Sequence, residues 1–460
     1  MTQTQPNARD DSSQRERRLS ARPRRTFAIR KARWVFWLMF AINVLNYLDR
    51  LIAVAAGPTI KAEFSLKDRD IGLLSSAFLL VYTLSALPLG LLADRARSRA
   101  RIVALGVGVW SVFSGLTALA RGFFSLVATR ALVGVGEASY YPAGTALLSA
   151  YFPREARARI MGRWQAGQMI GVLLAFGLVG ALFAVLPAAA AWRVAFLISA
   201  GPGLVLAGLM WFVTSTPHAS ADASSSDGTL PARDASRFGS GPPRSYAGQL
   251  LAALSIPSIW IVIALQSLVF TVTTPAITFL PIYIRSHNGP FRLSAAHASL
   301  LTGLIVVVGG VTGALLGGHL ADWLRRWHPG ARVLAPGAGM LVAMPFLFVM
   351  LLTTRLPIFC VAGTLTVLAL NLTTGPLTAI PQDVAPPHLR ASVVAVTMVI
   401  SHLLGDVWSP TVVGVVATAL HERAGPALLI VGGPALALGV AVAIVGAGIY
   451  ARNLSVAARD

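Results

Sequence analysis

Apolar runs of about 20 residues recur along almost the whole chain, and they constrain the fold more than any other feature of the sequence. A helix rises about 1.5 Å per residue, so a run of about 20 residues crosses the roughly 30 Å of hydrocarbon in a bilayer. Apolar side chains make up 55% of the 460 residues and charged side chains only 12%. Soluble domains do not combine these values, so we predict an all-α membrane protein.

Twelve such runs are present, and we interpret each of them as one transmembrane helix. They cover residues 34–56, 71–93, 101–120, 124–150, 159–186, 191–213, 257–284, 296–321, 332–353, 357–380, 391–420 and 425–451. The sequence therefore predicts twelve membrane-spanning helices, whose ends are defined to within several residues.

The chain is divided in its middle by a polar segment, residues 214–248, that is rich in Ser, Asp, Gly and Pro. Such a composition indicates a flexible linker. The two flanking parts share landmarks, since GLLADRAR (90–97) after the second span is matched by GHLADWLRR (318–326) after the eighth. We predict two pseudo-symmetric six-helix bundles, residues 34–213 and 249–451, the arrangement typical of secondary transporters.

The basic residues indicate how the chain is oriented in the membrane. The formal charge is +20, and arginines gather at the termini and on alternate loops such as 93–101, 152–163 and 321–332. Because cytoplasmic loops carry the excess of Lys and Arg, we expect both termini and the linker to be cytoplasmic, in the plasma membrane or bacterial inner membrane. We also expect a disordered basic tail over residues 1–33 and a short cytoplasmic tail over 452–460.

The same charge predicts contact with membrane lipids rather than nucleic acid. Basic segments beside a bilayer attract anionic lipids, and no aromatic residues interleave with the arginines as in nucleic-acid-binding motifs. Cys360 is the only cysteine, so a disulfide or a thiolate metal site cannot form within one chain. We expect a monomer without cofactors.

Four ionisable residues fall inside predicted spans, where each charge costs roughly 2.5–3.5 kcal/mol at a helix centre. Asp49 and Arg50 lie in the outer half of the first span, and Arg130 and Glu137 lie seven residues apart in the fourth. A spacing of seven places both on one helix face. We predict that Arg130 lies near Asp49 and that Arg50 reaches Glu137, which leaves the group without net charge.

This group has two interpretations. An acid that pairs with arginine in one conformation and leaves it in another changes its proton affinity with conformation, so Asp49 and Glu137 are candidate proton-coupling residues. Arg50 and Arg130 would then complete the substrate and charge network. The alternative is a static lattice of ion pairs that only holds two helices together.

Two further sets of residues are candidates. His402 and Asp406 lie one helical turn apart in the eleventh span, where they could relay a proton, bind a substrate headgroup or form a structural contact. The repeated Gly-x-Leu-x-Asp pattern predicts a cytoplasmic gate whose acids bridge the two halves, or alternatively two solvated acids at helix ends. The gate residues are Gly90, Asp94, Arg95, Gly318 and Asp322.

Four segments carry a resemblance to a known family. They are NYLDR (46–50), GVGEASYYPAG (134–144), YFPREARAR (151–159) and HLLGDVWSP (402–410). Together they resemble the Spinster-like branch of the major facilitator superfamily, lipid transporters whose eukaryotic members handle sphingosine phosphate or lysophospholipids. The resemblance implies the major facilitator fold and a coupling and binding network of Asp49, Arg50, Arg130 and Glu137. The chain departs from the family at Arg97 and Ser98, where glycine is common.

We therefore expect a secondary active transporter that works by alternating access. The resemblance implies proton coupling and an amphipathic, lipid-like substrate of the lysophospholipid or sphingoid type, or a hydrophobic drug. The alternative is a proton-coupled symporter of organic anions such as sugar acids, whose branch is similar in NYLDR and in the Arg130 and Glu137 spacing. A membrane enzyme or receptor is a distant alternative, because the chain has no nucleophile elbow, His-rich metal cluster or P-loop.

Overall fold

A computed structural model shows a chain whose regular structure, within the described residues, is entirely helical. The structure describes residues 8–96, 98–152, 154–213, 254–286, 290–324, 326, 328, 330–385 and 390–457. The predicted linker, residues 214–248, lies outside these ranges. The all-α fold class predicted from the apolar runs is confirmed.

The N-terminal half contains seven helices. They are α1 (Ala8–Ala55), α2 (Gly57–Glu63), α3 (Asp68–Arg95), α4 (Arg99–Thr117), α5 (Phe123–Tyr151), α6 (Arg154–Val185) and α7 (Ala188–Trp211). Only Arg30–Ala55 of α1 is apolar enough to span a membrane. The backbone helix nevertheless begins at Ala8, inside the segment that the sequence predicts as a disordered tail. Arg, Glu and Ala have high helix propensity, and here they continue a helix that the membrane span already nucleates.

The C-terminal half has the same plan with two interrupted spans. Its helices are α10 (Pro257–Arg285), α11 (Ala295–Leu324), α12 (Ala331–Leu352), α13 (Leu356–Asn371), α14 (Thr374–Val384), α15 (Arg390–Ser401), the π-helix η2 (His402–Asp406), α16 (Ser409–Ala419) and α17 (Ala424–Ala457). Proline cannot donate to the carbonyl four residues earlier. Pro376 therefore accompanies the break between α13 and α14, and Pro410 the break between η2 and α16.

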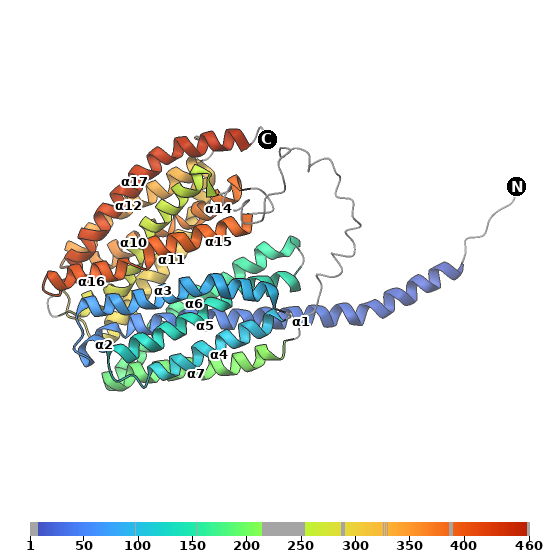
Figure 1. Ribbon diagram of the computed structural model, residues 1–460, viewed down its shortest axis with the longest axis horizontal. Coiled ribbons are helices and arrows are strands. Elements are labelled where there is room, and N and C mark those ends of the chain that lie inside the picture. The colour runs from blue at the N-terminus through green and yellow to red at the C-terminus, as the bar shows by residue number, and fades with distance from the viewer. Residues whose placement is uncertain are drawn as a thin grey trace.

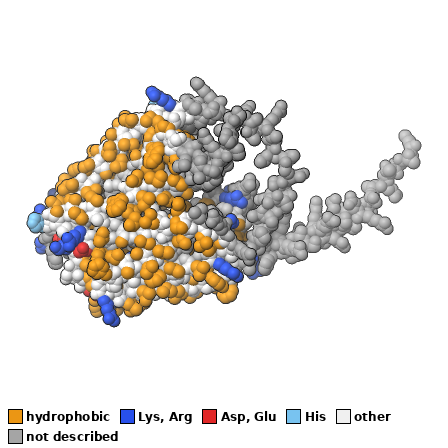
Figure 2. All heavy atoms as spheres, in the orientation of Figure 1, with side chains coloured by type: hydrophobic (Ala, Val, Ile, Leu, Met, Phe, Trp, Pro, Cys, Tyr) orange, Lys and Arg blue, Asp and Glu red, His pale blue; other side chains and the backbone are white. Residues whose placement is uncertain are grey.

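Eleven helical spans in the described part of the chain are long and apolar enough to cross a membrane. The fourth predicted span, α5, is as long at 29 residues and packs against α3 and α4, but it carries Arg130 and Glu137. Figure 2 shows hydrophobic side chains over the middle of one face and charged side chains gathered toward its two ends. With α5 counted, the helices follow the twelve-span prediction.

The two halves converge at the end of the molecule away from the termini (Figure 1). We call this the closed end. Here α3 packs against α16, and α6 against α11. A Cβ atom added at Gly72 would overlap the carbonyl oxygen of Pro410, so glycine is required for this close approach of α3 to α16. The described contacts between the halves extend from the closed end to Met169 of α6 and Gly310 of α11, near the middle of both helices.

Candidate functional site

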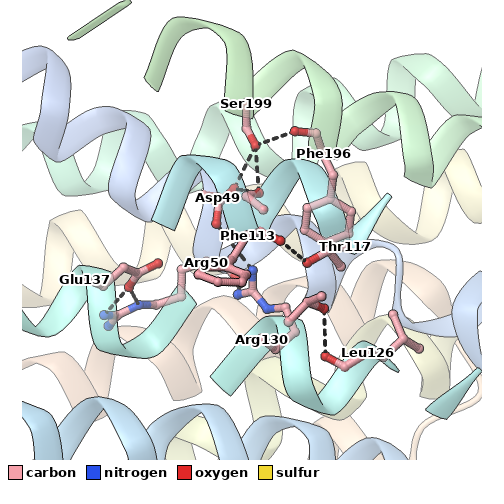
Figure 3. A network of polar contacts seen from close by, with 11 residues as sticks. Asp49, Arg50, Phe113, Thr117, Leu126, Arg130, Glu137, Phe196 and Ser199 are labelled. Carbon is pink, nitrogen blue, oxygen red and sulfur yellow. Dashed lines mark hydrogen bonds and ion pairs between the residues drawn. The ribbon is translucent and has the colours of Figure 1, made fainter. Parts of the chain in front are cut away.

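An ion pair lies in the interior of the N-terminal half, where Asp49 meets Arg130. Oδ2 of Asp49 accepts a hydrogen bond from Nη1 of Arg130 at 3.3 Å. Its Oδ1 accepts from the hydroxyl of Ser199 at 2.7 Å and from that of Ser114. The side chains of Asp49 and Arg130 are only 1% and 3% exposed. Four helices, α1, α4, α5 and α7, thus supply one enclosed charged cluster (Figure 3).

A second ion pair joins Arg50 of α1 to Glu137 of α5. Nε and Nη2 of Arg50 both donate to Oε2 of Glu137, at 3.1 and 2.7 Å. The Glu137 side chain is fully buried, whereas that of Arg50 is 21% exposed. Oε1 of Glu137 is buried and has no hydrogen-bond partner among the described residues. Nη2 of Arg130 reaches the carbonyl of Arg50 at 3.5 Å, which links the two pairs (Figure 3).

Aromatic rings surround the Arg50 guanidinium. Its Cζ lies 4.6 Å from the ring centre of Tyr82, 5.2 Å from that of Phe78 and 5.5 Å from that of Tyr47. Cation–π contacts at these distances attract a desolvated guanidinium. Arg50 is therefore held from two directions, by a carboxylate and by a set of rings.

Small residues of α5 explain why Glu137 can reach the interior of the bundle. A Cβ atom at Gly136 would lie 2.6 Å from the backbone nitrogen of Trp110 in α4, and one at Gly134 would lie 3.0 Å from the carbonyl oxygen of Phe78 in α3. Such glycines let helix backbones approach closely in membranes. They bring α5 against both neighbours and so place Glu137 beside α1.

The structure brings the four charged residues together in the two pairs expected from their spacing, Arg130 with Asp49 and Arg50 with Glu137. The roles assigned to them remain predictions. Sequence reasoning missed Ser114 and Ser199, because a single serine in an apolar span carries no signal that it faces a carboxylate. Among the four side chains only that of Arg50 is appreciably exposed.

The second predicted pair lies in the C-terminal half. Nδ1 of His402 pairs with Oδ2 of Asp406, and Oδ1 of Asp406 accepts from the hydroxyl of Thr274 in α10. The His402 ring stacks on that of Phe270 with 4.5 Å between centroids, and the imidazole remains 26% exposed. Thr274 and Phe270 were not predicted. Within the described ranges, no group of three or more His, Cys, Asp or Glu side chains could hold a metal ion.

The predicted cytoplasmic gate is described only in part. Gly90 faces Pro142 of α5, and Gly375 of α14 faces Gly318, so both gate glycines lie against helices of their own half. The side chains of Asp94, Arg95 and Asp322 lie outside the described part of the structure. A bridge between the halves at these acids stays a prediction.

The two serines on Asp49 lead to a prediction about stability. We expect Ser114→Ala and Ser199→Ala each to lower the free energy of unfolding by about 1.5–3 kcal/mol, the typical contribution of a hydrogen bond to a charged group. Ser139→Ala is the matched control, because its buried hydroxyl donates to the carbonyl of Gly136 in its own helix. Denaturant unfolding in detergent measures the difference. Equal losses in all three variants would contradict a specific role of the serines at Asp49.

The sequence matches one family profile over most of its length. The profile of the Major Facilitator Superfamily covers residues 38–410. The chain is 30% identical over 412 residues to "Protein spinster homolog 1" of Homo sapiens, an alignment that covers 84% of this chain and 73% of the human protein. It is 28% identical over 409 residues to the Xenopus tropicalis protein of the same name, with 85% and 74% covered.

Solved structures share the fold at lower identity. A bacterial homolog of the human lysosomal transporter Spinster, in an inward-facing and unoccupied conformation, superimposes with a TM-score of 0.74 at 22% identity, covering 92% of this chain and 97% of that one. A nucleoside transporter has a TM-score of 0.66 at 11% identity, with 90% of this chain and 99% of that one covered. The twelve-helix, two-bundle architecture is thus shared well beyond the range of sequence similarity.

Proposed function

Because this chain belongs to the Major Facilitator Superfamily and is a Spinster-like transporter, we propose that it moves an amphipathic, lipid-like substrate across the membrane by alternating access, driven by protons. Members of this family transport substrates rather than transform them. The observation that carries the proposal is the Arg50–Glu137 pair, in which a fully buried carboxylate is joined to a partly exposed guanidinium.

Alternating access is supported by where the halves touch. Their described contacts run from the closed end to the middle of α6 and α11, and Figure 1 shows the helices diverging toward the termini. Bundles built as repeats rock against each other around a central site. On the proposed orientation in an inner membrane, with cytoplasmic termini, the closed end faces outward and the site is reached from the cytoplasm.

We propose Glu137 as the first proton acceptor of the network. Its Oε1 has no hydrogen-bond partner among the described residues, and the side chain of its partner Arg50 is 21% exposed. A proton on Glu137 removes the charge that holds Arg50, so the guanidinium is released for an anionic headgroup. The Asp49 carboxylate accepts hydrogen bonds from three side chains. We propose that it is the second proton acceptor of the coupling pair, bound by more partners than Glu137.

The environment of Arg50 suits an amphipathic substrate. Its guanidinium can bind a phosphate or carboxylate in a bidentate manner, and the rings of Tyr47, Phe78 and Tyr82 provide apolar surface beside it. We propose that His402, which is partly exposed on the opposite half, binds the same headgroup or passes a proton. A lysophospholipid or sphingoid phosphate combines the required charge with a long apolar tail, and the resemblance to lipid transporters of the Spinster branch favours the same class.

The alternative is a proton-coupled symporter of organic anions. An exposed guanidinium binds a sugar carboxylate as readily as a phosphate, so Arg50 alone does not separate the two classes. What favours lipid over sugar is the set of three aromatic rings around Arg50, those of Tyr47, Phe78 and Tyr82, since sugars are bound through many polar groups.

Reconstitution into liposomes with an imposed pH gradient tests both substrate classes, lipid-like molecules and organic anions, in one experiment. We expect transport of lysophospholipid or sphingoid probes that depends on the gradient and disappears when a protonophore dissipates it. Sugar acids are tested side by side in the same vesicles. Gradient-driven uptake of a sugar acid with no response to any lipid would support the alternative instead.

A further inference from the structure

A polar cluster at the closed end joins the two halves away from the central site. Oε2 of Glu422, in the turn between α16 and α17, accepts from Nζ of Lys61 at 2.7 Å and from the backbone amide of Asp68 at 2.9 Å. The Lys61 ammonium also pairs with the Asp68 carboxylate. The adjacent amide of Arg69 donates to the hydroxyl of Thr418 at 3.0 Å. All of these partners of Glu422 and Thr418 belong to the N-terminal half.

Glu422 acts on a helix end of the opposite half. The first amides of a helix have no partner within it, and the helix dipole favours a negative charge there. Asp68 is the first residue of α3, so the C-terminal half supplies the carboxylate that satisfies this amide. Separation of the halves at the closed end must remove that acceptor.

The turn that presents Glu422 is held in a conformation that non-glycine residues rarely adopt. The φ angles of His421 and Glu422 are 58° and 60°, both in the left-handed region. Such residues are unfavourable unless surrounding contacts over-determine them. Glu422 and Arg423 also line a cavity of about 290 Å³ with Tyr283 and Thr353, which leaves the turn room to relax once its contacts break.

Glu422 is charged at neutral pH. Burial alone would raise its pKa, but hydrogen bonds from Lys61 and from the Asp68 amide outweigh burial and hold the pKa below its ordinary value. The charged groups that face it are Lys61 of α2 and Asp68 of α3, with His421 and Arg423 beside it in its own turn. Its contribution to closure is therefore complete above the ordinary glutamate pKa of about 4.3 and is lost only as the pH falls through the lowered value.

We propose that Glu422 is the latch of the closed end, which holds the halves together by pairing with Lys61 and capping α3 in the closed conformation. Its role rests on the alternating-access function proposed above. Glu63 provides the contrast, because this acid lies at the same end but binds Trp192 and Arg193 of its own half. Loss of Glu422 should open the closed end, whereas loss of Glu63 should not.

Distances between two spin labels test the latch at pH 7.5. In a Cys360→Ser background, which removes the single native cysteine, Arg121→Cys and Arg355→Cys place one label on each half at exposed loop positions of the closed end. In the parent protein a short distance reports the closed end and a long distance reports its opening. We expect Glu422→Gln to raise the population with long distances, relative to that with short distances, about tenfold or more. This is the effect of losing a charge-assisted hydrogen bond. Lys61→Gln removes the partner of Glu422 in the N-terminal half and should raise the same population ratio.

The controls separate the latch from general damage and from the transport proposal. Glu63→Gln and His421→Asn should keep the parent distribution, since neither removes a contact between the halves and asparagine tolerates the left-handed region. An unchanged distribution in both Glu422→Gln and Lys61→Gln overturns the latch, whatever the liposome assay shows. A shifted distribution in a protein that moves no substrate would support the latch and count against the proposed function alone.

Discussion

Glu137→Gln and Asp49→Asn are each expected to abolish gradient-driven transport while the protein stays folded in detergent. Each substitution removes a proton acceptor and keeps the shape of the side chain. A gradient of two pH units corresponds to about 100-fold accumulation per coupled proton, because one pH unit is about 1.36 kcal/mol. In the variants the accumulation ratio should fall to about one. Uptake into proteoliposomes with and without the gradient measures this ratio.

Glu63→Gln is the control for these two variants, since its carboxylate pairs with Arg193 at the closed end, away from the central network. It should accumulate substrate as the parent protein does. Unchanged driven transport in both Glu137→Gln and Asp49→Asn would falsify the coupling role. Failure of both to fold would support the static lattice, because removal of one partner from a buried ion pair leaves an uncompensated charge.

Gly72→Ala is expected to destabilise the closed end relative to the open conformation. The added Cβ would overlap backbone atoms of Pro410 and Thr411 in the opposite half, and no side-chain rotation can relieve a clash with backbone. Overpacking costs about 1–3 kcal/mol, which shifts the ratio of closed to open molecules by about 5- to 150-fold. Because alternating access needs both conformations, transport should fall in proportion to the loss of the closed one.

The label pair at residues 121 and 355 measures this shift directly. Gly208→Ala is the matched control, since a Cβ at Gly208 meets no atom within 4 Å and should leave both distances and transport unchanged. The outcome against the prediction is a parent-like distance distribution in Gly72→Ala. That result would mean that α3 and α16 can slide apart locally without separation of the halves.

The central network shows how far sequence reasoning reaches. Asp49 and Arg130 could be paired before the structure because helical rise fixes the depth of each residue in its span. The cost of unpaired charge in hydrocarbon then requires opposite charges to meet. The seven-residue spacing of Arg130 and Glu137 placed both on one face of α5, and the structure brings both to α1.

The partners that complete the network could not be predicted in this way. Ser114 and Ser199 meet Asp49 from spans 65 and 150 residues away along the chain, and Lys61 meets Glu422 across 361 residues. Each contact depends on how helices rotate about their axes and on which bundles pack together. Hydropathy, which is nearly uniform around these helices, does not specify that rotation.

The sequence by itself determined the membrane environment, the twelve spans, their division into two halves and the residues whose charge had to be balanced. These features follow from the thickness of the bilayer and the free energy of placing charge in hydrocarbon, which act on each segment separately. Only the tertiary structure decided that Asp49 is enclosed while Arg50 is partly exposed, and that Glu422 pairs with Lys61 of the other half. Those properties arise from contacts between distant segments, where glycines such as Gly72 allow helices to approach closely and serines such as Ser199 supply hydrogen bonds.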